Sequence, residues 1–187
     1  MVQIEIPDRA ALSEANRNYV EYFDKRLGHI PNLYLYMMHS ASAFDTFYTF
    51  HNRKTSLSLR EREVISLVVA EVNKSFYCLS AHTMIAKLNG FDEEQIIQVR
   101  EGKADFDPKL GVLAGLVKRL AEKTDLDLKT ELTAFFDAGY TRENLVDILH
   151  AMGENIISNL TAKTLTVPID FPLAQALNEG ENKRVEE

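Results

Sequence analysis

The sequence contains only one cysteine, Cys78, among its 187 residues. An intramolecular disulfide is therefore impossible, and the chain cannot be one of the small proteins that a disulfide framework holds together. A lone cysteine is more often an inert buried residue than a nucleophile. The neighbours of Cys78 must therefore decide what it does.

Three further absences narrow the class of protein. No stretch approaches the ~20 consecutive apolar residues that span a bilayer, and the N-terminus, MVQIEIPDRA, has neither the basic nor the apolar region of a secretory signal. No basic stripe is present, because 21 Lys and Arg are scattered against 28 Asp and Glu, for a net charge of −7. We therefore expect a soluble cytoplasmic protein whose partners include neither nucleic acid nor a membrane.

Strand signals are nearly absent, since no alternating run of β-branched residues is bounded by hairpin turns. Helical spacing of apolar residues instead predicts one helix from Leu12 to Leu27, ended by Gly28, and a second from Pro31 through Phe50. Further helices are expected at about 58–72, 75–88, 92–102, 108–120, 130–137 and 141–160. The tail at 167–177 is expected to be extended, with a short turn of helix.

The stretch LSLREREVISLVVAEV, residues 57–72, predicts the centre of the fold. Ser58 and Glu61 have the spacing of a capping box, and apolar residues cover most of the circumference of the helix that follows. We expect an all-α fold with about eight helices around a buried central helix pair. It forms a single domain over residues 1–180, and a charged, frayed tail follows at 181–187.

The motif SFYCLSAH, residues 75–82, places Ser75, Cys78 and His82 on one face of a helix. Cys78 would lie in the first turn, where unpaired backbone N–H groups and the helix dipole stabilise a thiolate. His82 could accept the thiol proton. On spacing alone, an inert Cys and His on the inner stripe of a helix remain an equal alternative.

The ordered residues around this motif closely resemble the core of AhpD-like proteins of the carboxymuconolactone decarboxylase family, which reads approximately E-x11-C-x-x-C-x3-H. Glu63, Cys78 and His82 stand at the matching positions, and Ser75 stands in place of the first cysteine. The likeness is specific over residues 57–96 and weaker in LGHIPNLYLYM and NLTAKTLTVPIDFP. Five residues frame the motif as in the peroxidase-related branch: Asn73, Tyr77, Ala81, His82 and Gly90.

This resemblance implies an AhpD-like helical fold, a homo-oligomer (dimer, trimer or hexamer) and a thiol peroxidase or disulfide reductase activity without cofactor or metal. By position, Cys78 would be the nucleophile, His82 its base and Glu63 the carboxylate of a Glu–water–His relay. Ser75 cannot form a disulfide, but it could donate a hydrogen bond to the thiolate. The resemblance therefore implies a one-thiol variant that acts on a peroxide or another small molecule and is resolved by an external thiol reductant.

Two other functions stay open. A carboxymuconolactone decarboxylase-like lyase would use His82 and Glu63 as acid–base residues, so it should survive Cys78→Ala and fail with His82→Ala. A degenerate, non-catalytic oligomeric binding protein would bury Cys78 with no pocket reaching it.

The remaining polar residues give weaker signals. His150 and Glu154, one helical turn apart, could bind a metal, but without a third ligand a surface pair is the plainer interpretation. Glu71 could join the active-site network or a subunit contact, whereas His51 has no partner that the sequence indicates. Six aromatic residues are expected to pack the core and to line a pocket or an interface: Tyr34, Tyr36, Phe44, Phe47, Tyr48 and Phe50.

Overall fold

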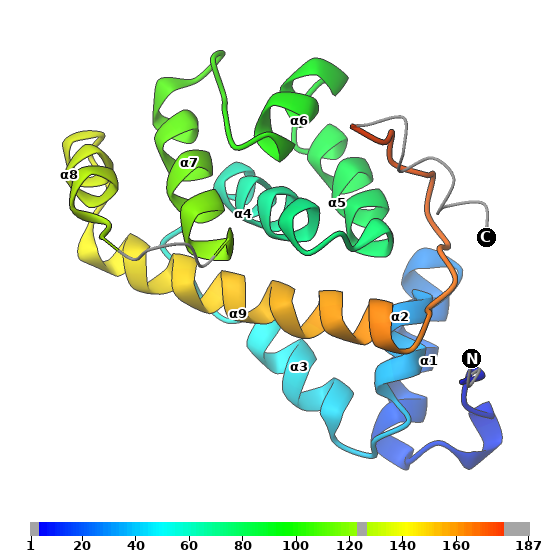
Figure 1. Ribbon diagram of the computed structural model, residues 1–187. Coiled ribbons are helices and arrows are strands. Elements are labelled where there is room, and N and C mark those ends of the chain that lie inside the picture. Colours follow the sequence, from blue (N-terminus) through cyan, green and yellow to red (C-terminus); the bar gives the residue numbers. More distant parts are fainter. Residues whose placement is uncertain (1–3, 123–126, 178–187) are drawn as a thin grey trace.

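The computed structural model describes residues 4–122 and 127–177, and within these ranges the chain is all-helical, with nine α-helices and no strand (Figure 1). No helix in these ranges has both the length and the apolarity needed to cross a membrane. The predicted frayed tail at 181–187 lies outside the described residues. The helices are α1 (Glu14–Leu27), α2 (Asn32–Met37), α3 (Ala43–His51), α4 (Leu59–Val72), α5 (Phe76–Leu88), α6 (Glu93–Arg100), α7 (Pro108–Glu122), α8 (Lys129–Asp137) and α9 (Arg142–Thr164).

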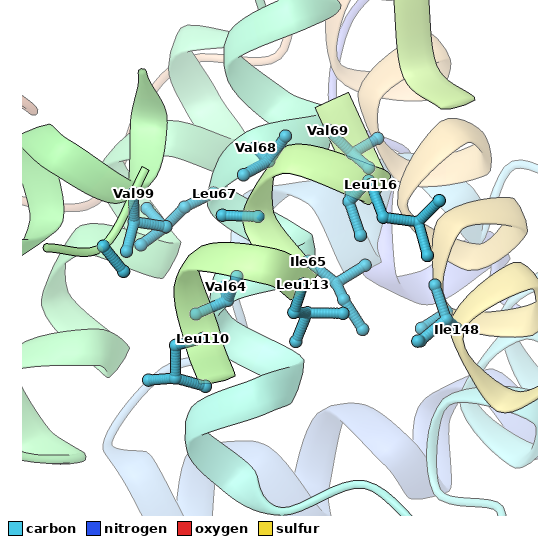
Figure 2. Close-up of a cluster of buried hydrophobic side chains, with 14 of the residues drawn as sticks. Val64, Ile65, Leu67, Val68, Val69, Val99, Leu110, Leu113, Leu116 and Ile148 are labelled. Atoms are coloured by element: carbon cyan, nitrogen blue, oxygen red, sulfur yellow. The ribbon is translucent and has the colours of Figure 1, made fainter. Parts of the chain in front are cut away.

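Helix α4 is the buried centre of the fold, as its apolar circumference predicts. Its capping box is formed, because Ser58 Oγ accepts from the Glu61 backbone N–H and the Glu61 carboxylate accepts from the N–H of Ser58. Helices α5, α6, α7 and α9 pack around it. Figure 2 shows the resulting cluster, in which five α4 side chains have no exposed surface: Val64, Ile65, Leu67, Val68 and Val69. Burying each such side chain contributes about 1.5–3 kcal/mol.

A second apolar cluster joins the N-terminal helices to α5. Phe23 of α1 and Phe44 of α3 pack in it together with Tyr77, Cys78 and Leu79 from the start of α5. The single cysteine therefore belongs to this second cluster rather than to the one around α4. Helix α9 contacts both α4 and the N-terminal helices α2 and α3.

The single helix expected from Pro31 through Phe50 is wrong, because the chain turns between α2 and α3. Buried Asn16 donates to the carbonyls of Met38 and Ser40, at 3.3 and 3.1 Å, and so satisfies acceptors that are freed where α2 ends. Ser40 Oγ accepts from the N–H of Ala43 at 3.2 Å, where α3 begins. Apolar spacing continues on both sides of this turn, so the sequence pattern does not reveal it.

The tail contains no helical turn over residues 167–177, which corrects the second expectation. This segment, the C-terminal strap, runs in Figure 1 in orange to red past α2 and α5. Asp170 accepts hydrogen bonds from the hydroxyl of Tyr77 at 2.8 Å and from the backbone N–H of Asn32 at 2.7 Å. The N–H of Ala174 donates to Ser80 Oγ at 3.1 Å. These contacts to other helices replace the bonds that a local turn would make.

Candidate active site

The cysteine lies in the first turn of α5, as its sequence position predicts. The chain leaves α4 through Lys74, whose φ of 53° is left-handed, and Ser75 is the N-cap residue of α5. Cys78 is thus the third residue of the helix, and His82 follows one turn later. Both line a cavity of about 320 Å³. The predicted face of α5 therefore opens onto a space that can hold a small molecule.

The environment of Cys78 keeps its thiol protonated. The side chain is 3% exposed, and burial raises its pKa to about 11, although the hydroxyls of Ser75 and Ser158 act in the opposite direction. Burial therefore outweighs the effect of the two hydroxyls. Ser75 Oγ is itself buried and bonds to no other side chain in the described residues. A thiolate at Cys78 would give this hydroxyl an acceptor.

The base expected beside Cys78 is held by a carboxylate. His82 Nδ1 lies 2.9 Å from Oε2 of Glu63, which projects from α4 and is 8% exposed. An ionised carboxylate only accepts, so Nδ1 is the donor and Nε2 is left to act as a base. In the described part of the chain, His82 and Cys78 are not hydrogen-bonded to each other. A proton that passes from Cys78 to His82 therefore needs an intervening molecule. The fold brings all four predicted residues together: Glu63, Ser75, Cys78 and His82.

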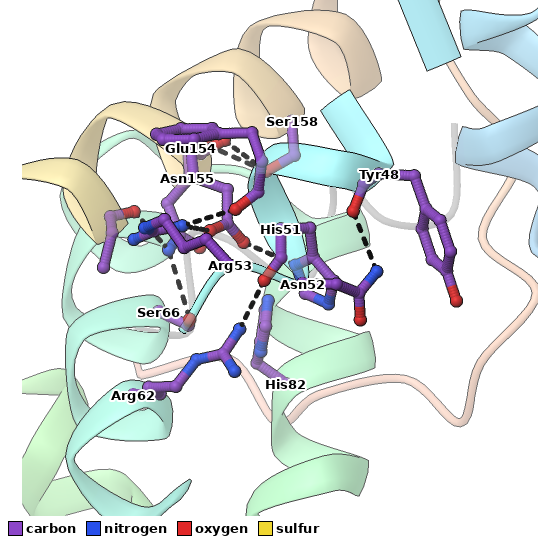
Figure 3. Close-up of polar contacts among 12 residues, drawn as sticks. Tyr48, His51, Asn52, Arg53, Arg62, Ser66, His82, Glu154, Asn155 and Ser158 are labelled. Atoms are coloured by element: carbon purple, nitrogen blue, oxygen red, sulfur yellow. Dashed lines mark hydrogen bonds and ion pairs between the residues drawn. The ribbon is translucent and has the colours of Figure 1, made fainter. Parts of the chain in front are cut away.

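A second histidine–carboxylate pair, which the sequence did not reveal, faces the same cavity. His51 Nδ1 lies 2.6 Å from Glu154 Oε1, and Arg53 donates to the other carboxylate oxygen at 2.8 Å (Figure 3). Burial raises the pKa of Glu154, but hydrogen bonds and charge from His51 and Arg53 outweigh it and hold the pKa below its usual range. The carboxylate is therefore ionised at neutral pH.

The expectation of a surface pair of His150 and Glu154 is wrong. Glu154 is 8% exposed and points to His51, whereas exposed His150 bonds through Nδ1 to the carbonyl of Val146. No three His, Cys, Asp or Glu side chains among the described residues are grouped to hold a metal ion. The one available sequence signal was the run of polar residues Glu154, Asn155 and Ser158 on the inner face of α9.

The wall of the cavity is mostly apolar and includes five aromatic rings. Its rings come from α1, α2, α3, α5 and the C-terminal strap, so residues from both ends of the described chain close it. None of the described lining residues is a lysine or an arginine. An apolar molecule therefore fits the wall better than an anion does. The rings are Phe23, Tyr34, Phe47, Tyr77 and Phe171.

A smaller cavity of about 190 Å³ lies behind the two histidines. Its other lining includes Arg62 and Ser66, which makes it more polar than the first cavity. Arg62 donates to the carbonyl of His51 at 3.2 Å, so it is more than a solvated residue at a helix start. Five residues line both cavities and form a partition between them: His51, His82, Ile85, Glu154 and Asn155.

Glu71 takes no part in this site. Its carboxylate accepts from Arg100 Nε at 2.7 Å, and Arg100 also donates to the carbonyl of Gln175 in the C-terminal strap. The sequence left two roles open for Glu71, and the structure excludes the first of them, a place in the active-site network. The Glu71–Arg100 pair instead connects α4, α6 and the strap.

Comparisons with known proteins agree with the observed fold. Residues 39–107 match the profile of the carboxymuconolactone decarboxylase family. Among solved structures, the AhpD core of a peroxidase-related protein from Ralstonia eutropha is 23% identical, with a TM-score of 0.81, covering 90% of this chain and 92% of the other. A peroxidase-related protein from Silicibacter is 20% identical, with a TM-score of 0.76, covering 89% and 90%.

A third solved structure is a cysteine-to-alanine variant of the debrominase Bmp8 in complex with 2,3,4-tribromopyrrole. It is 14% identical, with a TM-score of 0.71, covering 91% of this chain and 92% of the other. A search of curated proteins found no match. The helical arrangement is that of an AhpD-like protein. The match to the carboxymuconolactone decarboxylase family covers residues 39–107, so the similarity to that family is shown for this segment.

Proposed function

We propose that the protein is a thiol-dependent peroxidase in which Cys78 is the nucleophile. The observation that carries this proposal is that one cavity reaches both the buried thiol and the free side of the His82–Glu63 pair. A thiol with a pKa of about 11 needs a base to react at neutral pH, and His82 is the base on the same helix face.

The first half-reaction converts the thiol to a sulfenic acid. His82 Nε2 takes the proton of Cys78 through one water molecule, and Glu63 stabilises the resulting imidazolium. The thiolate attacks the outer oxygen of a hydroperoxide, forming an S–O bond and breaking the O–O bond. Cys78–SH and ROOH become Cys78–SOH and ROH, so sulfur is oxidised and the peroxide is reduced.

The second half-reaction needs a thiol that the chain does not supply, because Ser75 occupies the position of a resolving cysteine. An external thiol attacks the sulfenic sulfur, releases water and forms a mixed disulfide with Cys78. A second external thiol then frees Cys78 and leaves as the disulfide of the reductant. In both halves Ser75 donates its otherwise unpaired hydroxyl to the sulfur anion.

The aromatic wall supports an organic hydroperoxide, rather than hydrogen peroxide, as the preferred substrate. Phe23, Phe47 and Phe171 offer apolar surface that the organic group would bury. A variant of Bmp8, a protein of similar fold, forms a complex with 2,3,4-tribromopyrrole, a small aromatic ring. We extend this capacity to hold a small aromatic molecule to the present cavity.

The two competing functions fit the site less well. A lyase acting on a lactone acid would need a cation for the substrate carboxylate. The described lining residues of the larger cavity include no lysine or arginine, and Arg62 of the smaller cavity already donates to the carbonyl of His51. A degenerate, non-catalytic oligomeric binding protein would bury Cys78 with no pocket reaching it, whereas here a cavity reaches it.

Peroxide consumption in the presence of a small thiol tests the proposal. We expect an organic hydroperoxide to be reduced by the wild type and not by Cys78→Ser, with one sulfenic acid trapped at Cys78 in single turnover. His82→Gln should slow the reaction by about 100-fold or more, as loss of a general base does. Peroxide reduction no faster than with Cys78→Ser would refute the proposal, and loss of a lyase activity in His82→Ala alone would favour the alternative.

A further inference from the structure

We propose that His51 is a second acid–base residue of this cavity, and that it protonates the oxygen that leaves when the peroxide O–O bond breaks. This inference rests on the proposed peroxidase function and supplies a step that Cys78, His82 and Glu63 leave open. A hydroperoxide that loses its outer oxygen to sulfur leaves as an alkoxide. An alkoxide is a poor leaving group unless a proton reaches it as the bond breaks.

The position of His51 suits this task. It is the last residue of α3 and lines the cavity that reaches Cys78. His82 of α5, which is distant from it in sequence, lines the same cavity. Its ring stacks on Phe47, with centroids 6.2 Å apart and planes 18° apart, which fixes its orientation. The side chain is 31% exposed, so the ring can exchange protons, unlike a core histidine.

Glu154 and Arg53 orient this ring. Nδ1 of His51 donates to Glu154 Oε1 at 2.6 Å, so the proposed step requires His51 to start as the imidazolium, with its exchangeable proton on Nε2. Arg53 binds the second carboxylate oxygen at 2.8 Å, and its guanidinium lies 4.4 Å from the centroid of the Phe50 ring. The carboxylate is thus fixed from both sides. Glu154 and Arg53 are positioning residues, and His51 is the group that would touch the substrate.

The second cavity completes the proton balance. In the proposed step His82 gains the proton of Cys78, and the leaving alkoxide takes one from His51, so the charge of the site is unchanged. The two histidines must then exchange one proton before the next turnover. Both line the polar second cavity as well as the first, and this shared space gives the proton a route that does not cross the apolar wall.

Two peroxides with different leaving groups test the role of His51. An alkyl hydroperoxide releases an alkoxide, whose conjugate acid is about as weak an acid as water. A peroxycarboxylic acid releases a carboxylate, whose conjugate acid has a pKa of about 4, and needs no acid catalyst. We expect His51→Gln to slow sulfenic acid formation by the alkyl hydroperoxide about 100-fold, with the rate for the peroxycarboxylic acid close to that of the wild type.

Two controls separate this effect from structural damage. Alkylation of Cys78 by iodoacetamide releases iodide without a proton, so its rate in His51→Gln should match that of the wild type. His150→Gln removes an exposed histidine of α9 that lines neither cavity, and both peroxides should react normally with it. Should His51→Gln fail to fold, His51→Asn keeps a shorter amide at the same position and serves for the same comparison.

An equal fall in rate for both peroxides, or no fall for either, would overturn the assignment of His51 while leaving the peroxidase proposal intact. A wild type that reacts with neither peroxide would instead refute the peroxidase function, and the role of His51 with it. Selective loss of the alkyl hydroperoxide reaction is the one outcome that supports both.

Discussion

The hydroxyl of Tyr77 donates a hydrogen bond of 2.8 Å to Asp170, a residue 93 positions further along the chain. Since Asp170 also binds the N–H of Asn32, the C-terminal strap is fixed at one point to both α5 and α2. Phe171, the next residue, contacts the Tyr77 ring edge-on at 5.6 Å and lines the cavity. One carboxylate therefore holds part of the wall in front of Cys78.

Removing that carboxylate should open the cavity. We expect Asp170→Ala to lower the free energy of unfolding by on the order of 2 kcal/mol, because hydrogen bonds to a charged group are lost. A bulky maleimide should also label Cys78 faster, because Phe171 is released. Urea unfolding and labelling kinetics measure the two effects. Asp170→Asn keeps an acceptor, so its stability and labelling rate should lie between those of the wild type and Asp170→Ala. Unchanged labelling in Asp170→Ala would show that the strap does not control access to Cys78.

Burial of Cys78 predicts an unusual pH profile for its alkylation. The pKa of about 11 means that the rate with iodoacetamide should still be rising at pH 10, where an ordinary thiol has levelled off. The same reaction on the unfolded chain in urea provides the reference. A rate that levels off below pH 8 in the folded protein would show that helix dipole and hydroxyls outweigh burial.

The hydroxyl of Ser75 should stabilise the thiolate form of Cys78 rather than the thiol form. Because it lowers the pKa of Cys78, Ser75→Ala should raise that pKa and slow alkylation at neutral pH. The decrease should be about tenfold if the hydrogen bond is worth about 1.4 kcal/mol. Thr83→Val is a matched control in the same helix, since Thr83 lines neither cavity. Equal rates in wild type and Ser75→Ala would remove Ser75 from the site.

The ion pairs of Glu154 should make stability depend on pH. Its folded-state pKa lies below the ordinary value of 4.5, so the stabilisation is present above that pH and is lost as the pH falls through the folded pKa. We expect Glu154→Gln to cost on the order of 2 kcal/mol at pH 7. In acid the difference from wild type should shrink, because both side chains are then neutral.

Urea unfolding at pH 7 and in acid measures this difference. Glu93→Gln is the control, because the Glu93 side chain pairs with Lys87 but is 76% exposed, and we expect no measurable change at either pH. A cost of Glu154→Gln that is the same at both pH values would mean that shape, not charge, makes the variant unstable.

The buried centre of the fold was predictable because one pattern carried the information. The apolar circumference of α4 and the capping box of Ser58 and Glu61 both depend on residues close together in sequence, and both are confirmed. The break between α2 and α3 was missed because it depends on Asn16, a residue more than twenty positions away. The spacing of apolar residues within one segment cannot indicate a contact with a residue so far away in sequence.

The same distinction divides the site. Ser75, Cys78 and His82 were found through their spacing in one helix, whereas His51 and Glu154 are 103 positions apart and are joined only by the packing of α3 against α9. The roles of Cys78, His82, Glu63 and Ser75 stay predictions, as do the homo-oligomer and the cytoplasmic location.

The origin of the cavity wall has a consequence for how such a protein can change. The segment shared with the family, residues 39–107, carries Cys78, His82 and His51, while Phe23, Tyr34 and Phe171 lie outside it. Part of the cavity wall therefore comes from stretches outside the matched segment, although Phe47 and Tyr77 lie within it. Under the proposed function, exchanging the strap or the N-terminal helices would alter which molecule enters and would leave Cys78, His82 and His51 in place.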